Sequence, residues 1–323
     1  MELSEKGLRD RLSSDKLIGC FHVSKDGEGY FNDIRGGEGE LVEIPGLDEL
    51  TIDYHNDILK EGAFYSFLWR VSLDKTHLEV VGLPTQVDND EFLDTLFNVH
   101  IKMKGKALQD SINSQESTFS EVTGSEHTFV YELLQNANDY PYEKNPVKVK
   151  FVLSEHYLFF FHTGAEFNLR NIVGICSINQ GEKKKNTETI GYKGIGFKTV
   201  FVNNDFVFLS TGNWHFRFDK AYSEAAKYGK CAWSMMPIKT KVSELDEEAQ
   251  RVIKSTGEEY RVKFALRHKT DAGKNLVQID KVFANDDILL FIPNIDRVDI
   301  IAPSRQPFSI TKDLNKWIVD SLD

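Results

Sequence analysis

Two neighbouring apolar segments constrain the fold of this chain more than any other feature. Residues 147–153 read Val-Lys-Val-Lys-Phe-Val-Leu and residues 157–161 read Tyr-Leu-Phe-Phe-Phe, with Ser154-Glu-His156 between them. β-Branched and aromatic residues at this density favour strands. Strands this apolar have to be covered, so the sequence predicts a sheet with helices packed on one face.

Further short apolar runs in the C-terminal part would complete this sheet. They occupy residues 206–209, 215–218, 260–266, 288–292 and 298–301. A helix is expected over 169–176, whereas the charged residues 221–257 are partly helical and receive no firm assignment. The predicted fold class is therefore α+β, with a two-layer α/β sandwich in which helices cover one face of a mixed sheet.

The N-terminal part has a different pattern of short strands separated by glycine-rich turns. The strands are expected at residues 17–23, 29–31, 40–44, 63–71 and 77–81, which predicts a small antiparallel β-barrel. Residues 25–31, Lys-Asp-Gly-Glu-Gly-Tyr-Phe, are similar to the glycine-aromatic strand of cold-shock and OB-type barrels. Tyr30, Phe31, Phe64 and Trp69 could be barrel core or could stack on single-stranded nucleic acid, and both readings stay open.

These patterns divide the chain into three parts. The β-rich domain covers residues 1–88. A helix is expected from Glu91 to about Lys104, and the polar, serine-rich residues that follow are interpreted as a linker, so that residues 89–125 connect the domains. The larger domain covers residues 126–323.

Composition excludes several classes of protein. The net charge of −11 and the pI near 5.4 argue against a protein that coats nucleic acid over most of its surface. No apolar run reaches the roughly 18 to 20 residues that span a bilayer, and residues 1–6 do not resemble a signal peptide, so we expect no membrane association and a cytoplasmic location. Cys20, Cys176 and Cys231 are too few and too widely spaced for a disulfide framework or a four-thiolate zinc site.

One predicted helix carries a polar stripe. In the sequence Glu-Leu-Leu-Gln-Asn-Ala-Asn-Asp, Glu132, Asn136 and Asp139 fall at positions i, i+4 and i+7, on one face. Leu133, Leu134 and Ala137 would face the core. Carboxylates and an amide on one stripe are suited to a magnesium site, although an exposed stripe on an amphipathic helix is also commonly a solvated surface.

A glycine-rich segment follows about fifty residues later. Gly191, Gly194 and Gly196 would let backbone amides approach an anion, and the helical run that starts at Phe197 would favour a phosphate at its N-terminus. Lys193 and Lys198 are candidate phosphate contacts, and an exposed helical lysine is the alternative for Lys198. The polar stripe and the glycine-rich segment together indicate a nucleoside triphosphatase.

The two motifs, with Phe-His-Thr-Gly-Ala-Glu-Phe at 161–167 between them, resemble the GHKL superfamily of gyrase, heat-shock chaperone, histidine kinase and MutL ATPases. Within this superfamily, the motif sequences are most similar to those of the N-terminal ATP-binding domains of sacsin-like and MORC-like proteins. The resemblance covers roughly residues 120–302. It implies a Bergerat-type ATP-binding fold in the larger domain, with ATP and Mg²⁺ as cofactors.

The resemblance also implies roles for individual residues. Glu132 would be the general base that orients the attacking water, and Asn136 would complete the magnesium shell. Asp139 would lie in the second shell or at the nucleotide edge. The polar residues 179–189 would form a mobile lid. Gly191, Gly194 and Gly196 would close over the phosphates, and Lys193, Ile195, Phe197 and Lys198 would also belong to the cofactor-binding site.

The sequence departs from the family at the adenine-reading segment. Members of the family usually have Asp-x-Gly-x-Gly there, and the aspartate accepts from the adenine amino group. This chain has His162, Thr163, Gly164, Ala165 and Glu166. The first glycine is retained, whereas His162 replaces the aspartate and Glu166 replaces the second glycine, so selectivity for adenine is in question. His162 could equally be a buried structural histidine.

The function predicted from the sequence is Mg²⁺-dependent ATP binding with slow hydrolysis. By resemblance, hydrolysis would drive lid closure and a conformational switch or dimerisation within a larger assembly. The alternative is a module that senses nucleotide without significant turnover, with single-stranded nucleic acid as a further partner of the N-terminal domain. A histidine kinase ranks lower because no phosphoacceptor helix precedes Glu132.

Overall fold

The computed structural model describes residues 17–23, 29–33, 42–43, 59, 63–71, 78–122, 128–176, 193–269, 272–283, 292–303, 305–313 and 316–321. The chain divides into two compact units, the first ending at Phe92 and the second beginning at Leu93. No helix in these ranges is long and apolar enough to cross a membrane.

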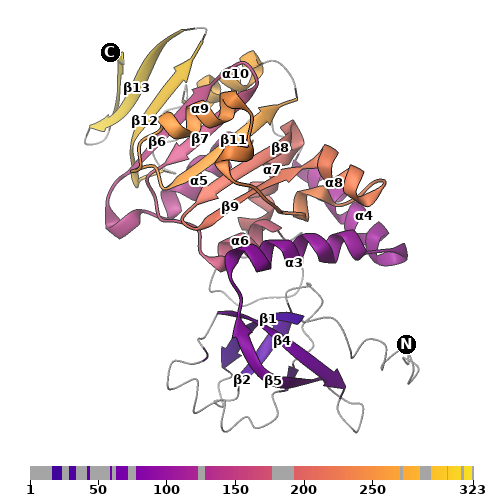
Figure 1. The fold of residues 1–323 in the computed structure, drawn as a ribbon. Helices are drawn as coiled ribbons and strands as arrows, with labels where there is room; N and C mark the ends of the chain where they lie inside the picture. Colours follow the sequence, from indigo (N-terminus) through magenta and orange to yellow (C-terminus); the bar gives the residue numbers. More distant parts are fainter. Residues whose placement is uncertain are drawn as a thin grey trace. The chain divides into compact units, whose positions relative to one another are not determined.

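The first unit contains a closed barrel with strand order β1-β2-β3-β5-β4 (Figure 1). The predicted barrel is confirmed, with one difference: β3 and β5 pair in parallel, and the other pairs are antiparallel. The side chains of Tyr30, Phe31, Phe64 and Trp69 lie outside the described part of the structure, so base stacking stays a prediction. The strands are β1 (Leu17–Val23), β2 (Gly29–Asp33), β3 (Val42–Glu43), β4 (Phe64–Val71) and β5 (Leu78–Gln86).

The second unit is built on a nine-stranded mixed sheet of order β10-β9-β8-β11-β7-β6-β12-β13-β14. Among the described strand pairs of this sheet, only β6 and β12 are parallel. Ile292 lies ahead of β12 rather than in a strand, and residues 288–291 fall outside the described ranges. The strands are β6 (Val147–Leu153), β7 (Tyr157–His162), β8 (Asn204–Thr211), β9 (Trp214–Asp219), β10 (Ile238–Lys239), β11 (Val262–His268), β12 (Ile295–Ala302), β13 (Arg305–Asp313) and β14 (Lys316–Ser321).

Helices and short 3₁₀ turns surround this sheet (Figure 1). The helices are α3 (Asn89–Lys102), α4 (Gly105–Val122), α5 (Thr128–Asp139), α6 (Leu169–Cys176), α7 (Lys193–Asn203), α8 (Lys220–Lys227), α9 (Glu247–Ser255) and α10 (Ala272–Phe283). The 3₁₀ turns are η1 (Tyr142–Lys144), η2 (Trp233–Met235) and η3 (Val242–Glu244).

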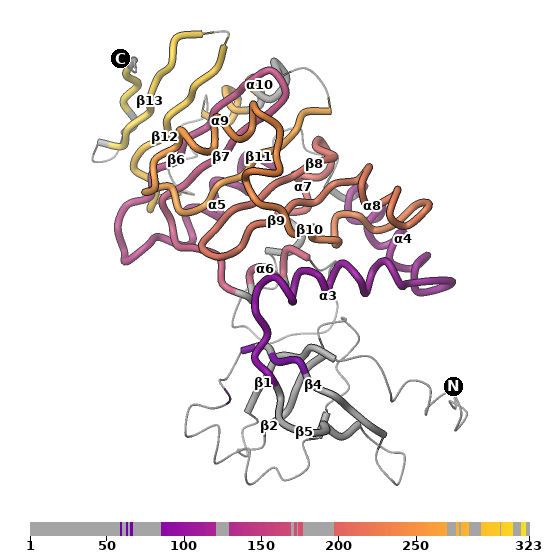
Figure 2. Tube along the Cα trace, in the orientation of Figure 1, coloured from indigo at the N-terminus to yellow at the C-terminus, as the bar shows by residue number. Residues whose placement is uncertain are grey.

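The interpretation of residues 105–125 as a linker is wrong, because α4 fills most of this segment. Ile112, Gln115 and Thr118 are buried at helical spacing. The Phe119 ring lies 6.5 Å from that of Phe201 and 6.3 Å from that of Trp233, measured between centroids. The buried stripe is partly polar, so the serine-rich sequence hid it. Helix α4 packs against α7, and both helices are labelled in Figure 2.

One face of the sheet packs against α5 and α7. On this face Phe160 lies 5.0 Å from Phe151 and 6.1 Å from Phe264, between ring centroids. Phe197 of α7 lies 5.7 Å from Phe264 on the same face. The predicted helical cover is therefore present, and α5 and α7 also pack against each other.

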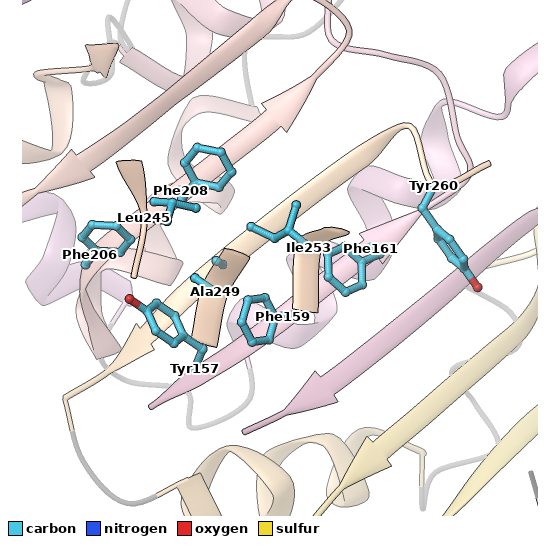
Figure 3. Packing of buried hydrophobic residues seen from close by; sticks show 10 residues of the cluster. Tyr157, Phe159, Phe161, Phe206, Phe208, Leu245, Ala249, Ile253 and Tyr260 are labelled. Carbon is cyan, nitrogen blue, oxygen red and sulfur yellow. The ribbon is translucent and has the colours of Figure 1, made fainter. Parts of the chain in front are cut away.

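The opposite face is covered as well, which corrects the expectation of helices on one face only. Every residue of β7 is buried, because strand alternation sends Phe160 to one face and Phe159 and Phe161 to the other. Figure 3 shows Ala249 and Ile253 of α9 beside these two rings. Around β7, β8 and β11 the unit thus has three layers rather than two.

Polar contacts hold α9 in place over this second face. Asp246 caps the helix by accepting from the Ala249 N–H (2.9 Å), and its other carboxylate oxygen accepts from the Tyr157 hydroxyl (2.5 Å). Glu248 accepts from the His156 backbone N–H (3.2 Å) and lies 2.7 Å from its Nδ1. The turn between β6 and β7 is therefore bonded directly to the start of α9.

Replacing Ile253 by alanine should lower the free energy of unfolding by about 2 to 5 kcal/mol, the usual cost of truncating a buried aliphatic side chain. Ile253 is only 3% exposed, whereas Arg251 on the same helix is exposed. Arg251→Ala is the control and should change stability by less than about 0.5 kcal/mol. Urea unfolding of both variants measures the difference, and equal effects would contradict the cover by α9.

Candidate functional site

Helix α5 presents the polar stripe as the sequence predicted. Leu133, Leu134 and Ala137 are at most 1% exposed and face the core. On the other side Glu132 and Asn136 are half-buried and Asp139 is exposed. The helix ends at Asp139. Its polar face therefore extends from a partly enclosed carboxylate to an open one.

The two carboxylates of this stripe influence each other. Burial raises the pKa of Glu132 above its usual value, and the negative charge of Asp139 raises it further. A half-buried carboxylate whose proton is bound more tightly than usual is better suited to accept a proton from water than an ordinary surface glutamate. The electrostatics therefore distinguish Glu132 from a solvated helix residue.

The C-terminal end of α5 is joined to the turn that follows β7. The Ala165 N–H donates to the carbonyl oxygen of Tyr140, the residue directly after α5 (2.7 Å). A Cβ atom on Gly164 would lie only 2.7 Å from this oxygen and 2.9 Å from Nδ1 of His162. Because no side chain fits there, the glycine allows the two segments to approach each other closely.

His162 is buried at the end of β7, with 1% of its surface exposed. Its Nδ1 accepts the N–H of Gly164 (3.2 Å), and its ring lies 5.8 Å from that of Phe160. Burial lowers the pKa of His162 to about 3, so the ring is neutral at physiological pH. Glu166, at the position of the second family glycine, instead lies against Gly212 in the β8–β9 turn.

Thr163 holds the ends of β6 and β7 together. Its hydroxyl accepts the Lys148 N–H (3.0 Å), and its own N–H donates to the Lys148 carbonyl (3.0 Å). Arg261, which the sequence did not single out, donates to the Thr163 carbonyl (3.1 Å) and stacks over Tyr142 at 3.7 Å from the ring centroid. Thr163 therefore has a structural role, and its nucleotide contact stays a prediction.

A second unpredicted residue, Asn138, fixes the position of α5. Its side-chain oxygen accepts the Asn294 N–H (2.8 Å), and the Asn294 side chain donates to the Asn138 carbonyl (2.8 Å). The Asn294 carbonyl in turn accepts the Val147 N–H (2.8 Å), at the start of β6. The asparagines of the motif indicate that one of them could attach the helix to its neighbours. Their spacing alone does not show which one is buried.

The glycine segment is described only in part. Lys193, Gly194, Ile195 and Gly196 form the first turn of α7, which packs against α5. Gly191 and the expected lid at 179–189 lie outside the described residues. Helix α7, which begins with this segment, therefore packs against the polar helix α5.

The side chains of two residues in the predicted cofactor-binding segment are part of the core. Phe197 is 3% exposed, and its ring lies 5.6 Å from Phe201. Lys198 is 1% exposed, and its ammonium group donates to the carbonyl oxygens of Ile175 (2.5 Å) and Ser234 (2.6 Å). Burial lowers the pKa of Lys198 to about 7. Sequence spacing could not reveal which helix face carries this lysine, so the predicted phosphate contact of Lys198 is corrected, whereas the cofactor-binding call on Phe197 stays a prediction.

The predicted metal ligand is Asn136. Within the described ranges, no group of three or more histidine, cysteine, aspartate or glutamate side chains could hold a metal ion by itself. Asn136 could supply one amide oxygen to Mg²⁺, an ion that is commonly held by few protein ligands together with substrate phosphates and water. The residues therefore suit a metal that arrives with a nucleotide.

Sequence comparison finds a similarity over part of the chain. The chain is 35% identical over 149 residues to Protein NO VEIN of Arabidopsis thaliana. The match covers 46% of this chain and 5% of the length of that relative. No protein-family model matches the chain.

Gly164→Ala should destabilise the protein by about 1 to 3 kcal/mol, the usual cost of forcing an extra methyl into a packed site. The control is Gly174→Ala in α6, where a Cβ atom would meet nothing within 4 Å. That variant should be stabilised by about 0.5 to 1 kcal/mol, because alanine favours a helix. Denaturant unfolding measures whether each substitution lowers or raises the free energy of unfolding. An unchanged free energy in Gly164→Ala would contradict the close approach to Tyr140.

Glu132→Gln should raise the thermal unfolding midpoint at pH 7. The raised pKa of Glu132 means that its ionised form is less stable in the folded chain than in the unfolded chain, and glutamine removes that charge. The advantage should grow as the pH rises above 4.5, the usual value for glutamate, and vanish below it, where both states are protonated. Glu116→Gln on the exposed side of α4 is the control, and an equal shift in both variants at pH 7 would reject the assigned environment.

Proposed function

We propose that the second unit binds a nucleoside triphosphate together with Mg²⁺ and hydrolyses it slowly. The observation that carries the proposal is the convergence of three predicted motifs. The stripe of α5, the turn after β7 and the first turn of α7 are far apart in sequence. The Ala165–Tyr140 hydrogen bond joins the end of α5 to the turn after β7, and α7, which begins with the glycine segment, packs against α5.

The length of the stripe supports a ligand that extends along α5. Glu132 and Asp139 are seven residues apart, which corresponds to about 10 Å along a helix. The Asp139 end adjoins the His162–Gly164 turn, where the base would bind. The triphosphate would then extend toward Glu132 and the N-terminus of α7, whose free amides and positive dipole end attract anions.

Each residue of the stripe then has a defined task. Glu132 would align the attacking water and accept its proton, as its raised pKa favours. Asn136 would contribute an oxygen to Mg²⁺, which would otherwise be held by phosphate oxygens and water. Catalysis at such a site consists mainly of positioning and of neutralising charge on the transferred phosphoryl group.

The resemblance to GHKL proteins supports ATP as the nucleotide and a switching role for hydrolysis. On this proposal, turnover would drive a conformational change, dimerisation or a rearrangement of a larger assembly. The expected lid belongs to this part of the proposal, and its residues fall outside the described ranges. The match covers only 5% of the length of Protein NO VEIN. Any activity of a longer protein that contains this region is therefore also part of the proposal.

The position of Lys198 favours a second candidate, a module that binds nucleotide without significant turnover. Its ammonium group is bonded to two carbonyl oxygens inside the protein, so it would not neutralise charge developing on a phosphoryl group. Measurable phosphate release that depends on Glu132 would separate the two candidates.

Glu132→Ala should reduce phosphate release at least about 100-fold while leaving the dissociation constant for Mg²⁺-ATP nearly unchanged, because a general base acts in the transition state. Asn136→Ala should weaken binding in the presence of Mg²⁺ and have little effect in its absence. Titration calorimetry and a phosphate-release assay measure the two quantities.

Gln135→Ala is the matched control, since Gln135 is exposed on the same helix between the two residues. It should bind and hydrolyse as the unaltered protein does. Release that is unchanged in Glu132→Ala would reject Glu132 as the base. Nucleotide binding without any release in the unaltered protein would favour the sensing module.

A further inference from the structure

The two edges of the nine-stranded sheet differ greatly in length. At one end, β10 is only two residues long, and an edge strand this short offers another chain little to pair with. At the other end, drawn in yellow in Figure 1, β14 spans six residues, or about 20 Å of strand. Within the described ranges only β13 pairs with β14, so the outer edge of β14 presents a row of backbone N–H and carbonyl groups.

The centre of β14 lacks the features that commonly protect an edge strand. The strand contains no proline, and it pairs with β13 in an unbroken register without a bulge. Its central residues Ile318 and Val319 are 38% and 65% exposed. Successive residues of a strand point to opposite faces, so apolar surface is exposed on both faces of the sheet at this edge. A regular, apolar edge of this kind is a template for pairing with another strand.

Backbone geometry limits how such a strand can pair with its own copy. In an antiparallel pair, two residues that stand opposite each other both direct their backbone groups toward the partner strand, or both direct them away. Because this direction alternates along a strand, a residue can stand opposite its own counterpart or opposite a residue an even number of positions away. The two-fold axis of a symmetric pair therefore passes through a residue position and not between two positions.

One of these registers makes the charges of β14 self-complementary. When the axis passes through Ile318, the two copies of Ile318 stand opposite each other, Trp317 stands opposite Val319, and Lys316 stands opposite Asp320. Symmetry repeats the pair of opposite charges at both ends, which favours the pairing. An axis through Trp317 or through Val319 would instead place a charged residue opposite Ile318.

We infer that the outer edge of β14 is a dimerisation surface, at which two copies of this chain join their sheets by antiparallel pairing centred on Ile318. Pairing satisfies the open backbone groups and brings the exposed side chains of Ile318 and Val319 into contact with the second copy. In the sheet, β6, β12 and β13 lie between β14 and β7, which precedes the candidate nucleotide site. The dimer therefore forms without nucleotide, in contrast to a dimerisation driven by ATP turnover.

Two single charge reversals test the register. Asp320→Lys would place lysine opposite lysine at both ends, and Lys316→Asp would place aspartate opposite aspartate. Each variant should dimerise about tenfold more weakly than the unaltered protein in analytical ultracentrifugation without nucleotide, because like charges opposite each other destabilise a strand pair. An equimolar mixture of the two variants should recover the dimer, since every charged pair is then attractive. The control is Asp110→Lys on the exposed side of α4, which makes the same change of charge and should leave the dimer unchanged.

A cysteine on the two-fold axis gives a second measurement of the register. In Ile318→Cys the two thiols would stand opposite each other, at a Cα separation of about 4.5 to 5.5 Å that a disulfide can bridge. In Asp320→Cys the two new cysteines would be four residues out of register, about 13 Å apart along the strands, which is too far. Oxidised glutathione should therefore cross-link Ile318→Cys and not Asp320→Cys. Both variants keep the same native cysteines.

The outcomes separate this inference from the proposed function. A dimer without nucleotide that shows the charge dependence and the Ile318→Cys cross-link supports the inference, even if ATP does not bind. A monomer at all concentrations, a dimer that neither reversal weakens, or equal cross-linking of the two cysteine variants overturns it. A dimer that forms only with Mg²⁺-ATP also overturns it and supports a switching role of the nucleotide instead. Circular dichroism checks that each variant folds.

Discussion

The Tyr140 carbonyl is the contact on which the candidate site depends. It accepts the Ala165 N–H and lies where a side chain on residue 164 would otherwise be. Through this oxygen the end of the polar helix α5 meets the turn after the central strand β7. Asn138 adds a second attachment from the same helix end to the approach to β12. The stripe is thus held at the end where its most exposed carboxylate lies.

The rigidity of this arrangement comes from β7. Its side chains are buried on both faces of the sheet, between the α5 and α7 layer on one side and α9 on the other. A strand enclosed in this way has little freedom to shift its register, because a slip would exchange the two sets of aromatic rings. The turn after β7 therefore starts from a fixed point, which is what a recognition element needs if it is to present one defined edge to a ligand.

The sequence predicted the parts of this protein whose local pattern is strong. The stripe of α5 follows from helical spacing, β6 and β7 follow from a high density of β-branched and aromatic residues, and the N-terminal barrel follows from short strands between glycine-rich turns. Helix α4 was missed because its buried stripe includes Gln115 and Thr118, which read as surface residues. The inward direction of Lys198 could not be read either, because its partners are backbone carbonyls at Ile175 and Ser234. Every residue type has a backbone carbonyl, so the sequence does not show which residues make such contacts.

The interior ammonium group of Lys198 also has a mechanical consequence. It bridges the last turn of α6 and the 3₁₀ turn η2, while its own backbone belongs to α7. If one of these elements moved without the others, the ammonium group or its carbonyl partners would lose their hydrogen bonds in the protein interior. Buried polar groups without partners cost free energy. Motion in this region should therefore carry α6, α7 and η2 together as a single rigid body. Bending would then be concentrated in the segments that join this block to the sheet.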